Sequence, residues 1–204
     1  MNEKVLWTIG DSIFHVNRDM VCDIASNVHC ASVTSDLSGA SVSPCRMAEQ
    51  SMVNLIKDGT FDRLFAGEIR PDVILVQRGV NDLYEYDVNG AMEMGEPTST
   101  DEKKTLLGAV NFCIGYFKRK FESAKLIWCT PMWSAATGES AFEEYREKLG
   151  KLCALRGITL LDVYDKAGIG KENQAEYLYD GTHPNSEGKK RLTEVFSDAL
   201  REVI

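Results

Sequence analysis

Short apolar runs of strand length recur along the chain, separated by segments whose apolar positions have helical spacing. The runs that predict buried strands are Val5–Ile9, Cys30–Thr34, Val73–Gln77, Lys125–Thr130 and Thr159–Asp162. A chain in which such strands alternate with helices folds into a mostly parallel sheet with helices on both faces. The pattern therefore predicts an α/β fold around a five-stranded sheet.

Three of the intervening segments place their apolar side chains on one face of a helix. They are Asp101–Phe121, Ser140–Ala154 and the segment that follows Asn185 and Ser186. No internal repeat or low-complexity segment divides the chain, so residues 1–204 are interpreted as a single domain.

Polar segments follow the predicted strands, and each begins near the point where a strand ends. Ser12 follows the first strand, and the segments SDLSGAS, RGVNDLY and PMWSAA follow the next three. A further polar segment, DGTHPN, comes shortly before the last helix. Ligands of open α/β sheets bind outside the carboxyl ends of the strands, so a site is expected at this rim. The long irregular stretch Leu83–Ser99 is a candidate lid or pocket wall.

Composition narrows the classes of protein that fit this pattern. The formal net charge of −8 argues against a nucleic-acid partner, because phosphate backbones are bound by clustered lysine and arginine. No apolar run approaches the ~20 residues of a membrane span, and the N-terminus shows no signal peptide. We therefore expect a cytoplasmic protein, although release by another route stays open. The sequence leaves the oligomeric state open and is compatible with a monomer.

Cysteine usage adds no site of its own. The six cysteines contain no C-x-x-C pair, and a domain of 204 residues does not need disulfides. We expect free thiols that are mostly buried.

Ser12 has two interpretations, as a helix cap or as a nucleophile. A serine after a strand commonly caps the following helix. A nucleophilic serine needs a base, and the base needs a partner that orients it. His183 follows Asp180 by three residues in DGTHPN, a spacing that lets the carboxylate reach Nδ1–H and leaves Nε2 for Ser12. Alone, that segment also fits a surface turn. His15 is an alternative base, but it lacks a paired carboxylate at a suitable spacing.

Acyl transfer also needs hydrogen-bond donors for the developing oxyanion. The backbone N–H of Ser12, the backbone N–H of Gly39 and the side-chain amide of Asn81 are candidates. Gly79 permits a sharp turn before Asn81. The alternatives are an ordinary turn at Gly39 and a helix cap in GVND.

The segment GDSI near the N-terminus, an isolated Gly39, GVND, and DGTHPN near the C-terminus occur in this order. This arrangement resembles the SGNH (GDSL-type) hydrolases over nearly the whole chain. The resemblance implies a flavodoxin-like, three-layer α/β/α fold. It also implies that Ser12 is the nucleophile, His183 the base and Asp180 its orienting acid, with an oxyanion hole formed by Ser12, Gly39 and Asn81.

The expected function is that of a serine esterase without a cofactor or a metal ion. Short acyl groups, acetyl esters of carbohydrates above all, are the expected substrates, because the segment after Asn81 is acidic. Tyr84, Tyr86 and Trp133 are candidates for stacking on a sugar, and core packing is the alternative for Trp133. Alternatively, Met92 and Met94 could fold into an apolar lid together with the same two tyrosines.

Three other functions remain to be weighed. A lysophospholipase or thioesterase would act on longer acyl chains, and a non-catalytic domain would only bind glycans or a protein. A metal-dependent hydrolase is disfavoured, because the three histidines lack the spacing of a ligand cluster. No G-x-S-x-G occurs, which excludes the nucleophile elbow of the α/β-hydrolases.

Overall fold

The computed structural model describes residues 4–34, 59, 62–63, 66, 70–80, 83, 106–137 and 139–204, without the side chains of residues 15 and 32–34. In these residues, a parallel sheet has five strands in the order β2-β1-β3-β4-β5. The strands are β1 (Lys4–Gly10), β2 (Cys30–Thr34), β3 (Val73–Gln77), β4 (Lys125–Cys129) and β5 (Thr159–Leu161). This is the flavodoxin-like order, and it confirms the predicted fold class.

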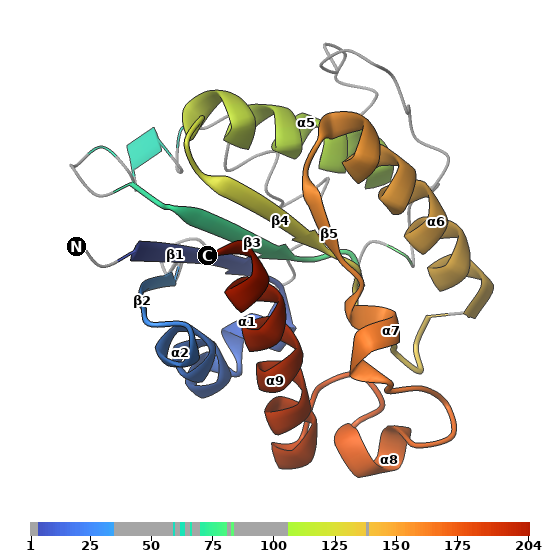
Figure 1. Ribbon diagram of the computed structural model, residues 1–204. Coiled ribbons are helices and arrows are strands. Elements are labelled where there is room, and N and C mark those ends of the chain that lie inside the picture. The colour runs from blue at the N-terminus through green and yellow to red at the C-terminus, as the bar shows by residue number, and fades with distance from the viewer. Residues whose placement is uncertain are drawn as a thin grey trace.

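Helices cover both faces of the sheet (Figure 1). On one face lie α5 (Leu106–Lys120) and α6 (Glu139–Arg156). On the other lie α1 (Ser12–His15), α2 (Arg18–Asn27) and α9 (Ser186–Val203). The described part of the chain therefore has three layers, with the sheet in the middle.

Aromatic pairs join β1 to α5 on one face of the sheet and α1 to α9 on the other. Trp7 of β1 packs edge-on against Phe117 of α5, with ring centroids 5.6 Å apart. Phe14 of α1 packs against Phe196 of α9 at 5.1 Å. All four side chains are buried. Such pairs stabilise a core beyond the area that they bury.

Two strands end one residue earlier than predicted, because polar side chains take over at their carboxyl ends. The Thr130 hydroxyl donates to an Asp162 carboxylate oxygen at 3.1 Å and accepts from the Tyr164 N–H at 3.0 Å. Asp162 also caps α7 (Val163–Ala167), which the periodicity did not predict. These bonds replace strand pairing with a capped helix.

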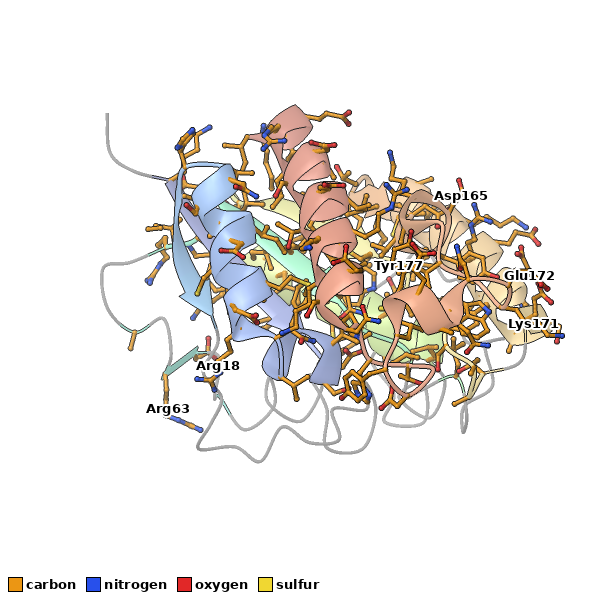
Figure 2. The ribbon with its side chains drawn as sticks, turned by 90° about the horizontal axis from the view of Figure 1, so that it is seen from below. Arg18, Arg63, Asp165, Lys171, Glu172 and Tyr177 are labelled. Carbon is orange, nitrogen blue, oxygen red and sulfur yellow. The ribbon has the colours of Figure 1, made fainter. Side chains whose placement is uncertain are left out.

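The last part of the chain packs α9 between α2 and two short helices. Figure 2 shows α2 and α9 side by side, with Tyr177 of α8 (Gln174–Tyr177) next to the N-terminal part of α9. Lys189 of α9 forms an ion pair with Asp19 of α2 at 3.0 Å. In the described residues, no helix is long and apolar enough to cross a membrane.

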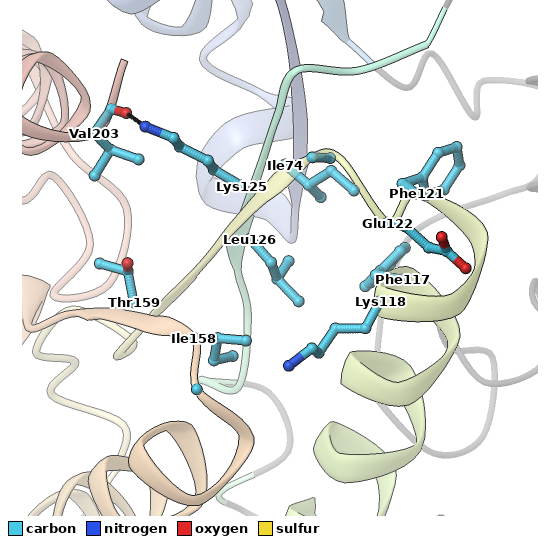
Figure 3. A pocket seen from close by; sticks show the side chains of 12 residues that line it. Ile74, Phe117, Lys118, Phe121, Glu122, Lys125, Leu126, Ile158, Thr159 and Val203 are labelled. Atoms are coloured by element: carbon cyan, nitrogen blue, oxygen red, sulfur yellow. Dashed lines mark hydrogen bonds between the residues drawn. The ribbon is translucent and has the colours of Figure 1, made fainter.

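A hollow of about 300 Å³ lies at the amino ends of the strands (Figure 3). Its wall includes Ile74, Leu126 and Ile158, which stand at or near the first residues of β3, β4 and β5. Lys125 reaches from this wall to the Val203 carbonyl oxygen (Figure 3). The polar segments predicted to form the site follow the opposite ends of the strands. This hollow is therefore separate from the expected site.

Candidate functional site

In the turn after β1, the Ser12 hydroxyl does not cap the following helix, because the preceding residue does. Asp11 is the N-cap of α1, and its carboxylate accepts a hydrogen bond from the Ile13 N–H at 3.0 Å. The interpretation of Ser12 as the cap is therefore wrong. Gly10 is required just before this turn, since a Cβ there would lie 2.5 Å from the Cβ of Phe14.

The fold brings together three side chains that the sequence singled out. The Nε2 atom of His183 lies 2.9 Å from the Ser12 hydroxyl oxygen, although 171 residues separate them. The Nδ1 atom of the same ring lies 2.7 Å from a carboxylate oxygen of Asp180. Both distances are those of hydrogen bonds. In such a line, the imidazole can accept the hydroxyl proton while the carboxylate orients the ring.

The loop holds Asp180 as an acceptor on both oxygens. One oxygen bonds the His183 ring, and the other accepts from the backbone N–H groups of Thr182 at 3.0 Å and His183 at 2.7 Å. Partial burial by itself raises the pKa of Asp180, but the hydrogen bonds from His183 and Thr182 outweigh it and lower this pKa below its usual value. The carboxylate is therefore ionised near neutral pH.

A narrow antiparallel pairing supports this loop. Leu178 pairs with Pro184, and the Tyr179 N–H donates to the His183 carbonyl oxygen at 3.0 Å. Asn185 then caps α9, because its side-chain oxygen accepts from the N–H groups of Glu187 and Gly188. The Asp180–His183 loop is thus clamped between a backbone bridge and the start of a long helix.

The segment after β4 holds the same loop from the other side. The hydroxyl oxygens of Ser134 and Thr182 lie 2.7 Å apart, and the Ala135 N–H donates to the Gly181 carbonyl oxygen at 2.8 Å. Gly181 has a φ of 81°, and a Cβ there would lie 2.9 Å from the Cβ of Ala135. Sequence reasoning placed PMWSAA at the rim but did not single out Ser134, whose fully buried hydroxyl supports the loop.

The turn that carries Ser12 includes the buried carboxyl of Asp11 and contacts the buried guanidinium of Arg78, and sequence reasoning assigned a role to neither side chain. Asp11 and Arg78 are each 1% exposed, and Arg78 donates through Nε to the Gly10 carbonyl oxygen at 3.1 Å. Burial raises the pKa of Asp11 to about 6, against the lowering effects of the Ile13 hydrogen bond and of the charges of Arg78 and His183. Asp11 and Arg78 therefore place opposite charges at the turn that carries Ser12.

The turn after β3 shows why GVND begins with glycine. Gly79 has a φ of 126°, in the region that favours glycine, and the Tyr145 ring lies 3.2 Å from where its Cβ would be. The Leu83 N–H donates to the Gly79 carbonyl oxygen at 3.1 Å. This turn starts at the carboxyl end of β3, next to β1 in the sheet.

Several predicted site residues are not placed by the structure. Gly39, Asn81, Tyr84 and Tyr86 lie outside the described residues, as does the segment 84–99. His15 ends α1, and its side chain lies outside the described part.

Trp133 belongs to the hydrophobic core and is 7% exposed. Its ring therefore offers little surface to a sugar, which favours the core-packing alternative. Among the described residues, no group of three histidine, cysteine, aspartate or glutamate side chains is placed to hold a metal ion.

Comparisons with known proteins show the family and the fold of this chain. The model of the GDSL-like Lipase/Acylhydrolase family matches residues 8–191. The structure is similar to that of a GDSL-like lipase from Parabacteroides merdae (TM-score 0.68, 18% identity, 100% of this chain and 99% of that one). It is also similar to a lipase/acylhydrolase from Enterococcus faecalis (TM-score 0.65, 13% identity, 98% and 96% covered). No curated protein sequence matches the chain.

Proposed function

Because the chain belongs to the GDSL-like Lipase/Acylhydrolase family, we propose that it hydrolyses carboxylic esters through Ser12, His183 and Asp180. The observation that carries this proposal is the continuous line of hydrogen bonds from the Ser12 hydroxyl through the His183 ring to the Asp180 carboxylate. A purely binding domain has no need of a serine that is left uncapped and aligned with a histidine.

Acylation begins at the Ser12 oxygen. It attacks the acyl carbon while His183 Nε2 takes the hydroxyl proton, and Asp180 stabilises the imidazolium. The carbonyl oxygen becomes an oxyanion, for which we assign the Ser12 N–H, the Gly39 N–H and the Asn81 amide as donors. The bond to the leaving alcohol then breaks, and the alcohol takes the proton from His183. The acyl group stays on Ser12.

Deacylation follows the same steps, with water as the nucleophile in place of the serine hydroxyl. His183 takes a proton from the water as it attacks the acyl carbon, and the bond to Ser12 breaks when the proton returns to the serine oxygen. The carboxylic acid leaves, and the site is restored. Ser12 follows the carboxyl end of β1, which pairs with β3, and this position supports the role, because the strand order reverses there and ligands bind at such a crevice.

We propose short acyl groups, and acetylated carbohydrates in particular, as the substrates. The segment that follows Asn81 is rich in carboxylates, which repel anionic lipid surfaces and suit a neutral polar leaving group: Asp82, Glu85, Asp87, Glu93 and Glu96. With the Trp133 ring buried, Tyr84 and Tyr86 are the remaining candidates for stacking on a sugar.

A series of p-nitrophenyl esters of increasing chain length tests both parts of the proposal. We expect the rate to peak at acetyl or propionyl and to fall beyond about six carbons, because a long chain gains ~0.8 kcal/mol per CH₂ only in a continuous apolar groove. Ser12→Ala should abolish hydrolysis while its circular dichroism stays unchanged, and a chelator should have no effect on the wild-type protein.

The outcomes separate the alternatives. A rate that rises through octanoyl esters would replace the carbohydrate substrate by a lysophospholipid or a thioester. Hydrolysis that persists in Ser12→Ala would contradict the assigned nucleophile, and loss of activity with the chelator would indicate a metal-dependent enzyme. A screen of acetylated sugars would then identify the leaving group.

A further inference from the structure

The ring of Tyr179 stacks against the ring of His183. The centroids of the two rings are 5.6 Å apart, and their planes differ by 17°. Tyr179 is 65% exposed, so its burial contributes little to the core. An aromatic side chain that covers no core but lies against the proposed base needs another explanation.

The backbone sets this contact. The Tyr179 N–H donates to the His183 carbonyl oxygen, and the adjacent residues Leu178 and Pro184 form an antiparallel bridge. Side chains that face each other across such a pairing stay within reach. The hairpin therefore presents the tyrosine ring to the imidazole even though the tyrosine is exposed to water.

The interaction of His183 with Asp180 leaves part of the stabilisation of the imidazolium to another group. The side chain of Asp180 is 41% exposed, and that of His183 is 24% exposed, so solvent screens the attraction between them. The negative face of an aromatic ring attracts a cation that lies within about 6 Å of its centroid. In the proposed reaction, the imidazole becomes positively charged when it accepts the serine proton.

We propose that Tyr179 is a positioning residue that acts through His183. Its ring keeps the imidazole in the plane that joins Ser12 to Asp180, and it stabilises the imidazolium that forms as Ser12 attacks. This inference rests on the proposed function, because it assumes that His183 is the base. It adds to the Ser-His-Asp chemistry a group that acts by its π-face, without hydrogen bonding.

The other charged groups near His183 stay in place when Tyr179 is changed. They include Asp180, which bonds the ring on the same loop, and Asp11 in the turn after β1, which interacts electrostatically with both His183 and Arg78. Because these groups remain, a change in the titration of His183 in a Tyr179 variant reports on the ring that was removed.

The test compares Tyr179→Leu, which removes the π-face, with Tyr179→Phe, which keeps it, and with Tyr179→Trp, which enlarges it. The titration of the His183 ring protons is followed by NMR, with His183→Ala used for assignment. We expect the midpoint in Tyr179→Leu to fall by about 0.4–0.7 pH unit, to stay unchanged in Tyr179→Phe and to rise in Tyr179→Trp.

Kinetics give a second measure of the same effect. In Tyr179→Leu, kcat on p-nitrophenyl acetate should fall about two- to five-fold, and the acidic limb of the kcat/KM profile should move to lower pH by the same amount as the midpoint. Leu155→Ala is the matched control, because Leu155 is also an exposed apolar side chain (41%) but lies on α6, and it should change neither quantity.

An unchanged midpoint in Tyr179→Leu would overturn the inference, as would a Tyr179→Phe variant that behaves like Tyr179→Leu. A rise in KM alone would make Tyr179 a substrate contact instead. The NMR titration does not depend on turnover. If the wild-type protein hydrolyses no ester, the proposed function fails while the titration still decides whether the stacked ring stabilises the imidazolium.

Discussion

At the scale of single residues, the site depends on Asp11 and Ser12 having different roles. Asp11 accepts from the Ile13 N–H and caps α1, which leaves the Ser12 oxygen for His183. The sequence motif showed both residues but not which of them capped the helix, because either oxygen suits that role. The backbone geometry of the turn decides it.

Substitutions of His183 and Asp180 test the proposed base and its partner. His183→Ala should lower kcat almost as far as Ser12→Ala, because members of such a group act as a unit. Asp180→Asn should lose on the order of 10²–10⁴-fold in kcat, since the ring loses the group that orients it. Asp23→Asn, on an exposed aspartate of α2, is the control. An inactive His15→Ala beside an active His183→Ala would mean that the base has been misassigned.

The buried Asp11 carboxyl predicts a dependence of stability on pH. Burial raises its pKa from the ordinary 3.8 to about 6, so the folded state disfavours the ionised form. The free energy of unfolding should therefore fall as the pH rises from about 4 to about 6, and this loss should persist at higher pH. Asp11→Asn removes the charge. It should be more stable than the wild-type protein by about 3 kcal/mol at most above pH 6, and the difference should vanish near pH 4.

Urea unfolding of both proteins across this pH range measures the effect, with Asp23→Asn again as the exposed control. Parallel pH profiles for the wild-type protein and Asp11→Asn would show that Asp11 is not the titrating group.

At the scale of elements, the Asp180–His183 loop is positioned by its neighbours. The backbone bridge at Leu178 and Pro184 closes it, and the buried Ser134 hydroxyl contacts Thr182. The sequence predicted the loop and the helix that follows, because DGTHPN and the apolar periodicity after Asn185 are local signals. The contact with Ser134 joins segments 48 residues apart, so no local pattern shows it.

A substitution at Gly188, in the first turn of α9, tests whether the Asp180–His183 loop depends on its neighbours. A Cβ there would lie 2.2 Å from the Tyr177 carbonyl oxygen and 3.0 Å from the Pro184 Cβ. Gly188→Ala should therefore destabilise the protein by about 1–3 kcal/mol and lower activity, because relief of the clash displaces the loop that carries His183.

Gly170→Ala provides the matched control. Nothing lies within 4 Å of a Cβ at Gly170, so the substitution should be neutral or slightly stabilising. Chemical unfolding and ester hydrolysis are measured on both variants. Equal stability of the two would contradict the close approach of α8 to α9.

At the scale of the whole molecule, the sheet order places the site. The chain runs from β1 outward to β2 and then returns across β1 to β3, so the carboxyl ends of β1 and β3 flank the point where the order reverses. Gly10, Gln77 and Cys129 share one register position at the ends of their strands. The polar segments that follow β1, β3 and β4 therefore leave the same edge of the sheet, whereas SDLSGAS lies outside the described residues.

The reactivity of the cysteine thiols tests how well the three layers exclude solvent from the core. In the described residues, Cys22 is an exposed thiol, while the thiols of Cys30, Cys113, Cys129 and Cys153 are buried. Burial raises the pKa of Cys153 to about 12 and that of Cys129 well above its usual value, which suppresses their thiolates.

We expect one fast reaction with a thiol reagent in a Cys45→Ser background, at Cys22, with the other thiols reacting only as the protein unfolds. The variant removes the one cysteine that lies outside the described residues. Fast labelling of Cys129 in folded protein would contradict a sealed core, and a Cys22→Ser variant should abolish the fast phase.

The sequence by itself determined the class of fold, the family and the identity of Ser12, Asp180 and His183 as a candidate set. The periodicities of strands and helices and the three-residue spacing of Asp180 and His183 are local patterns. Each involves residues that are close together in the chain, so the sequence alone shows it. Only the tertiary structure decided that Asp11 and not Ser12 caps α1, that Trp133 is buried, and that Tyr179 faces the His183 ring. Capping depends on backbone angles, burial depends on three packed layers, and the ring contact depends on a bridge between two loop segments, none of which a period along the chain encodes.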